Sequence, residues 1–149
     1  MPLTYNSLLT PQKPAALTAV ATTANTNYTD TPTNMVEFLP ANGNTIAVEY
    51  PNGLRLSSLK ALARATPTAT ELQLFVSDAA GAVKRFISST LMAAYTVAQT
   101  TGQTEVDFTY GASAISDSNP LILAAGERLW FAIGVTNTGI VARAEGGAY

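Results

Sequence analysis

The sequence predicts an all-β fold: an antiparallel β-sandwich, of the jelly-roll or Ig-like kind, with an extended N-terminal arm. Three observations predict it. Short segments in which apolar and polar residues alternate recur along the chain, as in strands with one buried face. Turn-forming Gly, Asn, Asp and Pro residues separate these segments at short intervals. Long helical patterns alternating with strands are lacking, so a parallel α/β sheet is not expected.

The N-terminal part of the chain differs from the rest. Residues 1–34 are expected to form the arm and residues 35–149 the sandwich domain. The arm holds four of the eight prolines, and proline interrupts helices and central strands. One short strand is expected over 17–22. The arm has too few large apolar side chains to fold alone, so it is expected to dock on its own domain or on a neighbouring molecule.

Turn signals delimit the expected strands of the domain. An Asn-Gly pair tolerates the positive φ of tight hairpins, and such pairs stand at 42–43 and 52–53. Residues 71–77 alternate most clearly, with Leu72, Leu74 and Val76 on one face. The expected strands are residues 35–39, 45–50, 54–59, 71–77, 82–88, 105–110, 121–123, 128–136 and 140–145.

Two segments also fit a helix. Residues 57–65 combine an N-cap residue with good helix formers, and residues 83–95 place several apolar side chains near one helical face. Short apolar stretches fit either structure, and the hairpin-like neighbours of both segments favour strands.

The residue types that are missing narrow the possible chemistry. The 149 residues include no His and no Cys. Nucleophilic catalysis by a Ser–His pair or by a thiolate is therefore excluded, and so are disulfides. The absence of Cys is compatible with synthesis in a reducing cytoplasm. Only 12% of the residues are charged, about half of the roughly 25% that is usual, which favours a neutral surface for protein contacts.

Composition also argues against two classes of partner. The formal net charge is −2, and no basic cluster exceeds the pair Lys84-Arg85, so nucleic acid is not an expected partner. The longest apolar run, residues 129–135, is too short to cross a bilayer, and the first residues lack the pattern of a signal peptide. No membrane partner and no targeting segment are expected.

Candidate catalytic and metal-binding groups have simpler interpretations. Glu105 and Asp107 form a carboxylate pair, but their alternation with apolar residues places them on an exposed strand face. Ser57 and Lys60 match a Ser-x-x-Lys spacing without the partner motifs that catalysis needs. Residues 117–119 resemble part of a Ca²⁺ loop and equally an ordinary turn. We therefore expect no catalytic residue, no metal site and no cofactor.

Aromatic residues are the best candidates for contacts with a partner. Trp130 alternates with the apolar face of its strand, so it is either an exposed anchor for a partner or part of a strand buried on both faces or covered by the arm. Tyrosine provides a large contact area with few rotatable bonds, which suits the docking of loose segments. The candidate interface residues are Tyr5, Leu8, Leu9, Tyr28, Trp130 and Tyr149.

From Leu54 onward the chain resembles small β-sandwich virion proteins of tailed bacteriophages, in particular head decoration (cement) proteins. The resemblance rests on the hairpin 71–88 around DAAG (78–81), on PLILAAGERL (120–129) and on VARAEGGAY (141–149). It implies a capsid component without enzymatic activity, located on the outer surface of the virion and made in the host cytoplasm. It also implies the major capsid protein as partner, a homotrimer, and extended termini that clasp neighbouring subunits.

Two other functions stay open at this point. One is a receptor-binding or carbohydrate-binding module of a phage tail or fibre, for which an aromatic cluster near Trp130 is expected. The other is a structural component of the tail or baseplate. An enzyme is the class that the sequence supports least.

Overall fold

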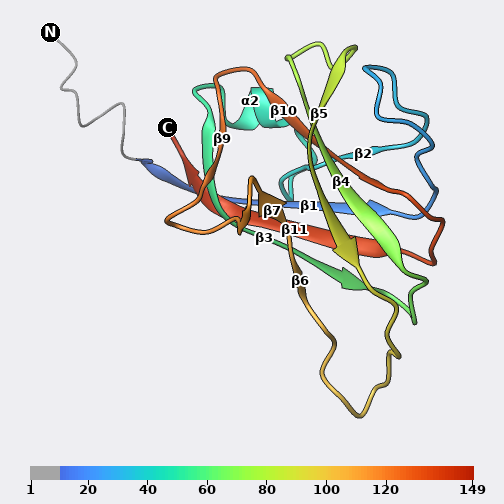
Figure 1. The fold of residues 1–149 in the computed structure, drawn as a ribbon. Coiled ribbons are helices and arrows are strands. Elements are labelled where there is room, and N and C mark those ends of the chain that lie inside the picture. Colours follow the sequence, from blue (N-terminus) through green and yellow to red (C-terminus); the bar gives the residue numbers. More distant parts are fainter. Residues whose placement is uncertain (1–10) are drawn as a thin grey trace, which may run out of the picture.

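The structure, a computed structural model, describes residues 11–149. It confirms the all-β, sandwich-like prediction: two antiparallel sheets face each other across one hydrophobic core (Figure 1). The strands are β1 (Lys13–Ala21), β2 (Val36–Glu37), β3 (Leu54–Ala63), β4 (Thr70–Ser77), β5 (Lys84–Met92), β6 (Val106–Asp107), β7 (Thr109–Tyr110), β8 (Ser113–Ala114), β9 (Leu121–Leu123), β10 (Arg128–Ile133) and β11 (Ile140–Ala148), and α2 is Ile46–Glu49.

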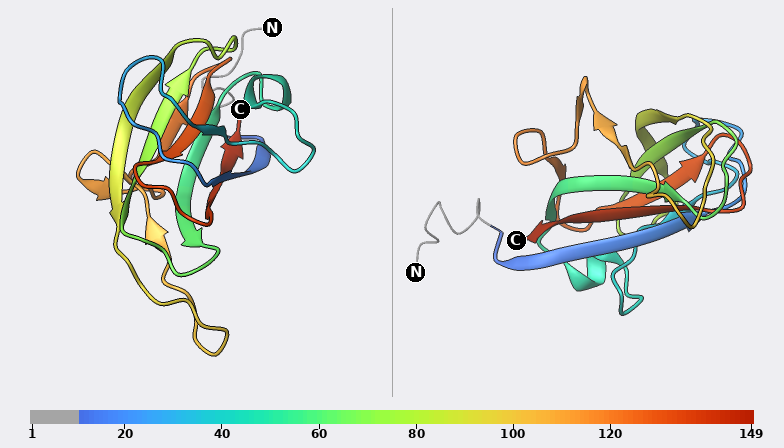
Figure 2. Two further views of the ribbon diagram at one scale, coloured as in Figure 1. Left: turned by 90° about the vertical axis from the view of Figure 1, so that its right-hand side faces the viewer. Right: turned by 90° about the horizontal axis from the view of Figure 1, so that it is seen from below.

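The strands form two main sheets and a small hairpin. The five-stranded sheet has the order β1-β11-β3-β6, with β9 also paired to β3. The four-stranded sheet has the order β2-β10-β4-β5, and β7 pairs with β8. The first and last strands are neighbours, so β1, β11 and β3 run side by side (Figure 2, right).

The described part of the arm docks on its own domain, one of the two options that the sequence left open. β1 pairs with β11 over nine residues, from Lys13 opposite Ala148 to Ala21 opposite Ile140. The strand expected over 17–22 therefore begins earlier, at Lys13. Alternate residues of β1 point into the same core as the rest of the sandwich, and Leu17 is fully buried. Residues 13–21 are thus an integral strand of the sandwich and not an appended extension.

One expected strand is wrong. Residues 45–50 form the short helix α2 instead, because Thr45 caps it by accepting a hydrogen bond from the backbone N–H of Val48 at 3.3 Å. Ile46 and Tyr50, four residues apart, both face the core, whereas Val48 is 67% exposed. Of the two segments that also fitted a helix, 57–65 overlaps β3 and 83–95 contains β5, so the preference for strands is confirmed.

Two crossing segments, one around Phe38 and Leu39 and the other at residues 105–110, run from one sheet to the other and close the sides of the sandwich. On one side, the backbone N–H of Phe38 donates to Leu129 O of β10, and Leu39 exchanges hydrogen bonds with Thr18 of β1. On the other side, the expected strand 105–110 divides into β6 and β7. Phe108, between them, donates from its backbone N–H to Leu59 O of β3 at 3.0 Å and places its ring in the core.

The core combines small side chains from one sheet with large ones from the other. Phe38, Phe131 and Phe108 form a row across it, with ring centroids 6.0 and 5.7 Å apart. The inner face of the five-stranded sheet is rich in alanine. Small residues opposite large ones fill the space between layers without voids, which gives the alanine-rich composition a structural role. The buried alanines of this sheet are Ala15, Ala19, Ala21, Ala61, Ala63, Ala142, Ala144 and Ala148.

Candidate interaction surface

Residues 22–34, which we call the strap, lie over the outer face of the four-stranded sheet. Asn25 donates from Nδ2 to Gln73 Oε1 of β4 at 2.8 Å. At the far end of the strap, Asp30 O accepts from the backbone N–H of Lys84 in β5 at 3.0 Å. The strap therefore spans two strands, at the end of the molecule away from the start of β1 and from the C-terminus (Figure 1).

The buried side chain of Asn25 holds the strap in place. Besides Gln73, its Nδ2 donates to Asn27 O at 2.5 Å. Its Oδ1 accepts from the backbone N–H of Thr33 at 2.9 Å and from the Thr33 hydroxyl at 3.2 Å. Asn25 thus has four hydrogen bonds and no unsatisfied polar atom, which explains why a polar side chain only 3% exposed is tolerated here.

An aromatic row runs across the sheet beneath and beside the strap. Trp130, Phe75 and Phe86 are register partners on β10, β4 and β5. The rings of Phe75 and Phe86 lie 5.3 Å apart, and Tyr28 of the strap lies 4.8 Å from Phe86. Phe75 is fully buried, so this sheet is covered on both of its faces around the centre of the row.

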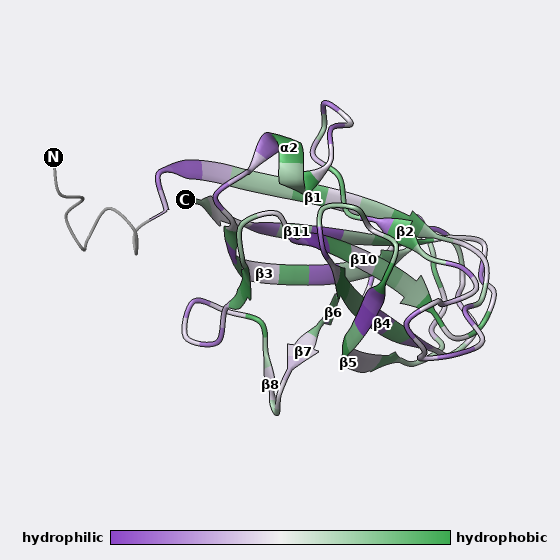
Figure 3. Cartoon of the chain, turned by 90° about the horizontal axis from the view of Figure 1, so that it is seen from above, coloured by the Kyte–Doolittle hydropathy of each residue, from purple (hydrophilic) through white to green (hydrophobic). Residues whose placement is uncertain are grey.

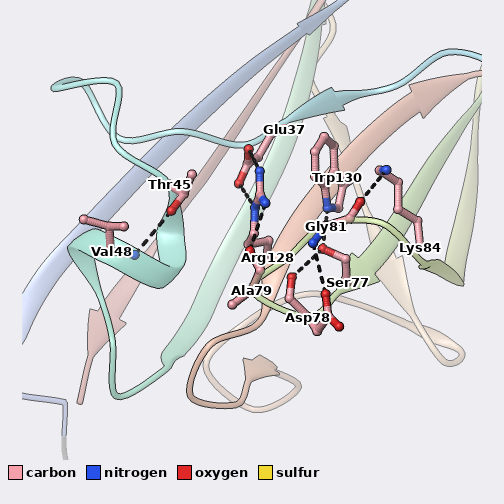
Figure 4. A network of polar contacts seen from close by, with 10 residues as sticks. All are labelled: Glu37, Thr45, Val48, Ser77, Asp78, Ala79, Gly81, Lys84, Arg128 and Trp130. Atoms are coloured by element: carbon pink, nitrogen blue, oxygen red, sulfur yellow. Dashed lines mark hydrogen bonds and ion pairs between the residues drawn. The ribbon is translucent and has the colours of Figure 1, made fainter.

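Trp130 is half-buried and makes its polar contacts within the chain (Figure 4). Its Nε1 donates to Ser77 Oγ at 2.8 Å. Lys84 Nζ lies 4.5 Å from the centre of the indole ring and Arg128 Cζ lies 4.9 Å from it. These cation–π contacts and the hydrogen bond fix the ring without any partner molecule.

Arg128 joins three parts of the chain beside this indole. Its Nε and Nη2 donate to the two carboxylate oxygens of Glu37 in β2, each at 2.6 Å, and Nη1 donates to Ala79 O at 3.1 Å (Figure 4). The hydrogen bonds with Glu37 raise the pKa of Arg128, and partial burial opposes them. Gly81, in the turn that carries Ala79, has φ +74°, and a Cβ there would lie 2.6 Å from Arg128 Nη1.

A hollow of about 410 Å³ opens between the strap and the ends of β4 and β10. Tyr28 donates its hydroxyl to Glu71, and Gln73 Nε2 donates to the same carboxylate at 3.2 Å. Burial by itself would raise the pKa of Glu71, but hydrogen bonds from Tyr28, Ser89 and Gln73 outweigh it and lower that pKa. Donation to Glu71 raises the pKa of Tyr28. The hollow therefore holds an ionised carboxylate beside an exposed tyrosine ring.

The structure brings two of the predicted interface residues to one face and places the others elsewhere. Tyr28 and Trp130 lie at the two ends of the aromatic row, although the sequence offered no sign that they are close. Tyr149 is at the opposite end of the molecule, where its backbone N–H donates to Gly53 O at 3.2 Å. Tyr5, Leu8 and Leu9 lie outside the described residues.

Sequence reasoning missed the strap and its partners Phe86 and Glu71. One signal could have indicated them: Phe75 alternates with Glu71, Gln73 and Ser77 on the polar face of its strand, and a large apolar residue there indicates that this face is covered.

The carboxylate pair expected on an exposed face is there. Glu105 and Asp107 are about half exposed, and both pair with Lys60, at 3.2 and 3.7 Å. Between Pro11 and Tyr149, no three carboxylates gather in a way that could hold a metal ion. The same residues include no helix that is long and apolar enough to cross a membrane.

Comparisons with known proteins add nothing to this description, because no family model, no curated protein and no solved structure matches the chain.

Proposed function

We propose that the protein is a structural component of a bacteriophage virion without enzymatic activity, a decoration protein that binds the major capsid protein on the outer surface of the head. The observation that carries this proposal is the anchored root of the N-terminal segment. Gln12 donates from its backbone N–H to Ala148 O at 2.7 Å, at the start of a strand paired over nine residues. The eleven residues before Gln12 carry no charged side chain and include Leu3, Tyr5, Leu8 and Leu9.

The rest of the molecule supports the same role. Its sandwich is closed by the two crossing segments. The polar groups of the strap, and those of Arg128 with Glu37 and Ala79, form hydrogen bonds within the chain. Such a domain is a rigid body to which a contact segment is attached. In the proposed mechanism, residues 1–10 contact a capsid subunit. Any ligand that binds only the assembled shell stabilises it by mass action.

Removal of the contact segment tests the proposal. The deletion must stop before Pro11, because a deletion of residues 1–34 would also remove β1 and with it one edge of the five-stranded sheet. We expect a variant lacking residues 2–10 to fold normally and to bind undecorated capsids at least about tenfold more weakly in co-sedimentation, a loss of about 1.4 kcal/mol or more. Unchanged binding would rule out the proposed mechanism.

A matched pair of variants refines this test. Leu8→Ala combined with Leu9→Ala removes apolar contact area from the segment, whereas Ser7→Ala combined with Thr10→Ala changes only small polar side chains nearby. We expect the first variant to weaken capsid binding and the second to leave it unchanged. If both variants bind alike, the segment does not contact the shell through its apolar side chains.

The hollow beside the strap favours one second candidate, a carbohydrate-binding module. Tyr28 is 53% exposed and adjoins the ionised Glu71, which is a suitable combination for stacking on a sugar and accepting hydrogen bonds from its hydroxyls. This candidate predicts glycan binding that Tyr28→Ala abolishes and that Tyr110→Ala, at a similarly exposed ring, leaves intact. Absence of binding on a broad glycan array would eliminate it.

A further inference from the structure

The outer face of the five-stranded sheet is bare, unlike that of the four-stranded sheet. No other segment between residues 11 and 149 lies over it as the strap lies over the opposite sheet. One row of register partners crosses four strands of the bare face: Thr18, Arg143, Lys60 and Asp107. The next row consists of Val20, Val141 and Leu62, which are half-buried. Hydrophilic bands on β3 and β11 mark charged positions of the bare face (Figure 3).

A hollow of about 500 Å³ lies in this face. Its apolar floor includes Leu62 and Val141, and its rim combines two cations with two carboxylates: Lys60, Arg143, Glu105 and Glu145. The rim charges pair with each other within the chain: Lys60 Nζ lies 3.2 Å from Glu105 Oε2, and Arg143 bonds to Glu145.

These pairs are easily exchanged for contacts with another molecule. The four rim side chains are about half exposed, between 46% and 57%. Exposed pairs of this kind contribute little to stability, so a side chain that turns toward a new partner loses little. The long stems of Lys60 and Arg143 are also able to lie along apolar surface and to fill a hollow opposite them.

We infer that two copies of this chain associate through the bare face, sheet against sheet. The two cations of this face stand among three carboxylates, since Asp107 lies 3.7 Å from Lys60 Nζ. This mixture of signs favours a second copy over an acidic or a basic partner, because a partner of one sign would meet like charges as well as opposite ones. In a pair related by a two-fold rotation, every contact occurs twice. A cation of the first copy that faces a carboxylate of the second is therefore matched by the same contact with the two copies exchanged. The apolar row and floor then form the dry centre of the contact.

The inference is independent of the capsid assignment and differs from the homotrimer that the resemblance implies. Packing through one self-complementary face produces a closed pair, so the mass of the assembly distinguishes the two. Binding to capsids is a separate measurement, and its failure would leave the pair intact.

Charge reversal in two complementary variants tests the pair. Lys60→Glu with Arg143→Glu makes the rim acidic, and Glu105→Lys with Glu145→Lys makes it basic. By light scattering after size exclusion, we expect the native protein at twice its chain mass of 15.6 kDa and each variant alone at 15.6 kDa. An equimolar mixture of the two variants is expected to recover the mass of a pair. Circular dichroism confirms that both variants are folded.

A control variant exchanges an exposed ion pair on the other sheet. Asp30→Lys with Arg85→Glu reverses a pair whose members are 51% and 68% exposed, far from the bare face, and is expected to leave the association unchanged. The inference is overturned if the native protein is a monomer at about 0.5 mM, which corresponds to binding weaker than about 4.5 kcal/mol. It is equally overturned by a trimer mass, or by variants that each associate as the native protein does.

Discussion

At the scale of single residues, a few charged side chains join elements that are far apart in the sequence. Glu49 is one of them. Its carboxylate accepts from Lys13 Nζ at 2.8 Å, from Asn42 Nδ2 at 2.9 Å and from Asn44 Nδ2 at 3.3 Å. The side chain thereby ties α2 both to the start of β1 and to the turn that precedes the helix.

The titration of Glu49 leads to a prediction about acid stability. Hydrogen bonds from Lys13, Asn42 and Asn44 lower the pKa of Glu49 to about 2, whereas a carboxyl of this type in the unfolded chain has a pKa of about 4.3. Because the folded pKa is the lower one, the contribution of Glu49 to stability is present above pH about 4.3 and disappears as the pH falls toward about 2.

The comparison of the native protein with Glu49→Gln measures this contribution. We expect the variant to be less stable at pH 7 and the difference in unfolding free energy to shrink steadily between pH 4.5 and pH 2, as followed by urea titration at each pH. A difference that stays constant over this range would show that the carboxylate charge contributes nothing.

At the scale of elements, the joint between β11 and β3 depends on a glycine. The pairing shifts register between Glu145 and Gly146, where β11 comes very close to β3. A Cβ at Gly146 would lie 2.0 Å from Arg55 O and 2.8 Å from Leu56 Cα, and both of these are backbone atoms that cannot rotate away.

Gly146→Ala is therefore expected to push the two strands apart and to destabilise the protein by about 1–3 kcal/mol or more, as measured by urea unfolding. Gly102→Ala is the matched control, because no atom lies within 4 Å of a Cβ at that exposed loop position. If the two variants have equal stability, the close approach at the bulge is relieved without cost.

Alternation of polar and apolar residues was enough to find most strands, but it misled at one element. The pattern at 71–77 predicts β4 correctly, since Leu72 and Leu74 are fully buried. At 45–50 the same two-residue spacing of Ile46 and Val48 coexists with the four-residue spacing of Ile46 and Tyr50. The capping hydroxyl of Thr45 decides in favour of the helix.

The candidate surface was less accessible to sequence reasoning because distant contacts create it. Asn25 and Gln73 are 48 residues apart, and neither has a local pattern that indicates a buried amide pair. Likewise, alternation placed Trp130 and Arg128 together on the second face of their strand, but Lys84, the other cation at the indole ring, comes from β5. The strap contacts both β4 and β5, so its position depends on the pairing of these two strands, which the sequence alone does not give.

At the scale of the whole molecule, the two crossing segments and the centre of the core form one structural unit. Phe38 belongs to the segment that closes one side and Phe108 to the segment that closes the other, and both rings pack against Phe131 of β10. All three rings are essentially inaccessible to solvent. Loss of the middle ring is therefore expected to loosen both closures at once.

Phe131→Ala tests whether the sandwich unfolds as a single unit. We expect a loss of about 3–5 kcal/mol, the usual cost of removing a buried phenylalanine ring, a large part of the total stability of a small domain. Trp130 is the only tryptophan, so its fluorescence reports on the four-stranded sheet while circular dichroism reports on all strands. Because the row of rings connects both closures, the two signals should give coincident urea transitions in the native protein and in the variant.

Phe86→Ala, at a ring 38% exposed on the outer face, serves as the control and should lower the unfolding free energy less than Phe131→Ala does. Separate transitions for the two signals would mean that the sheets unfold independently and that the row of rings does not couple them.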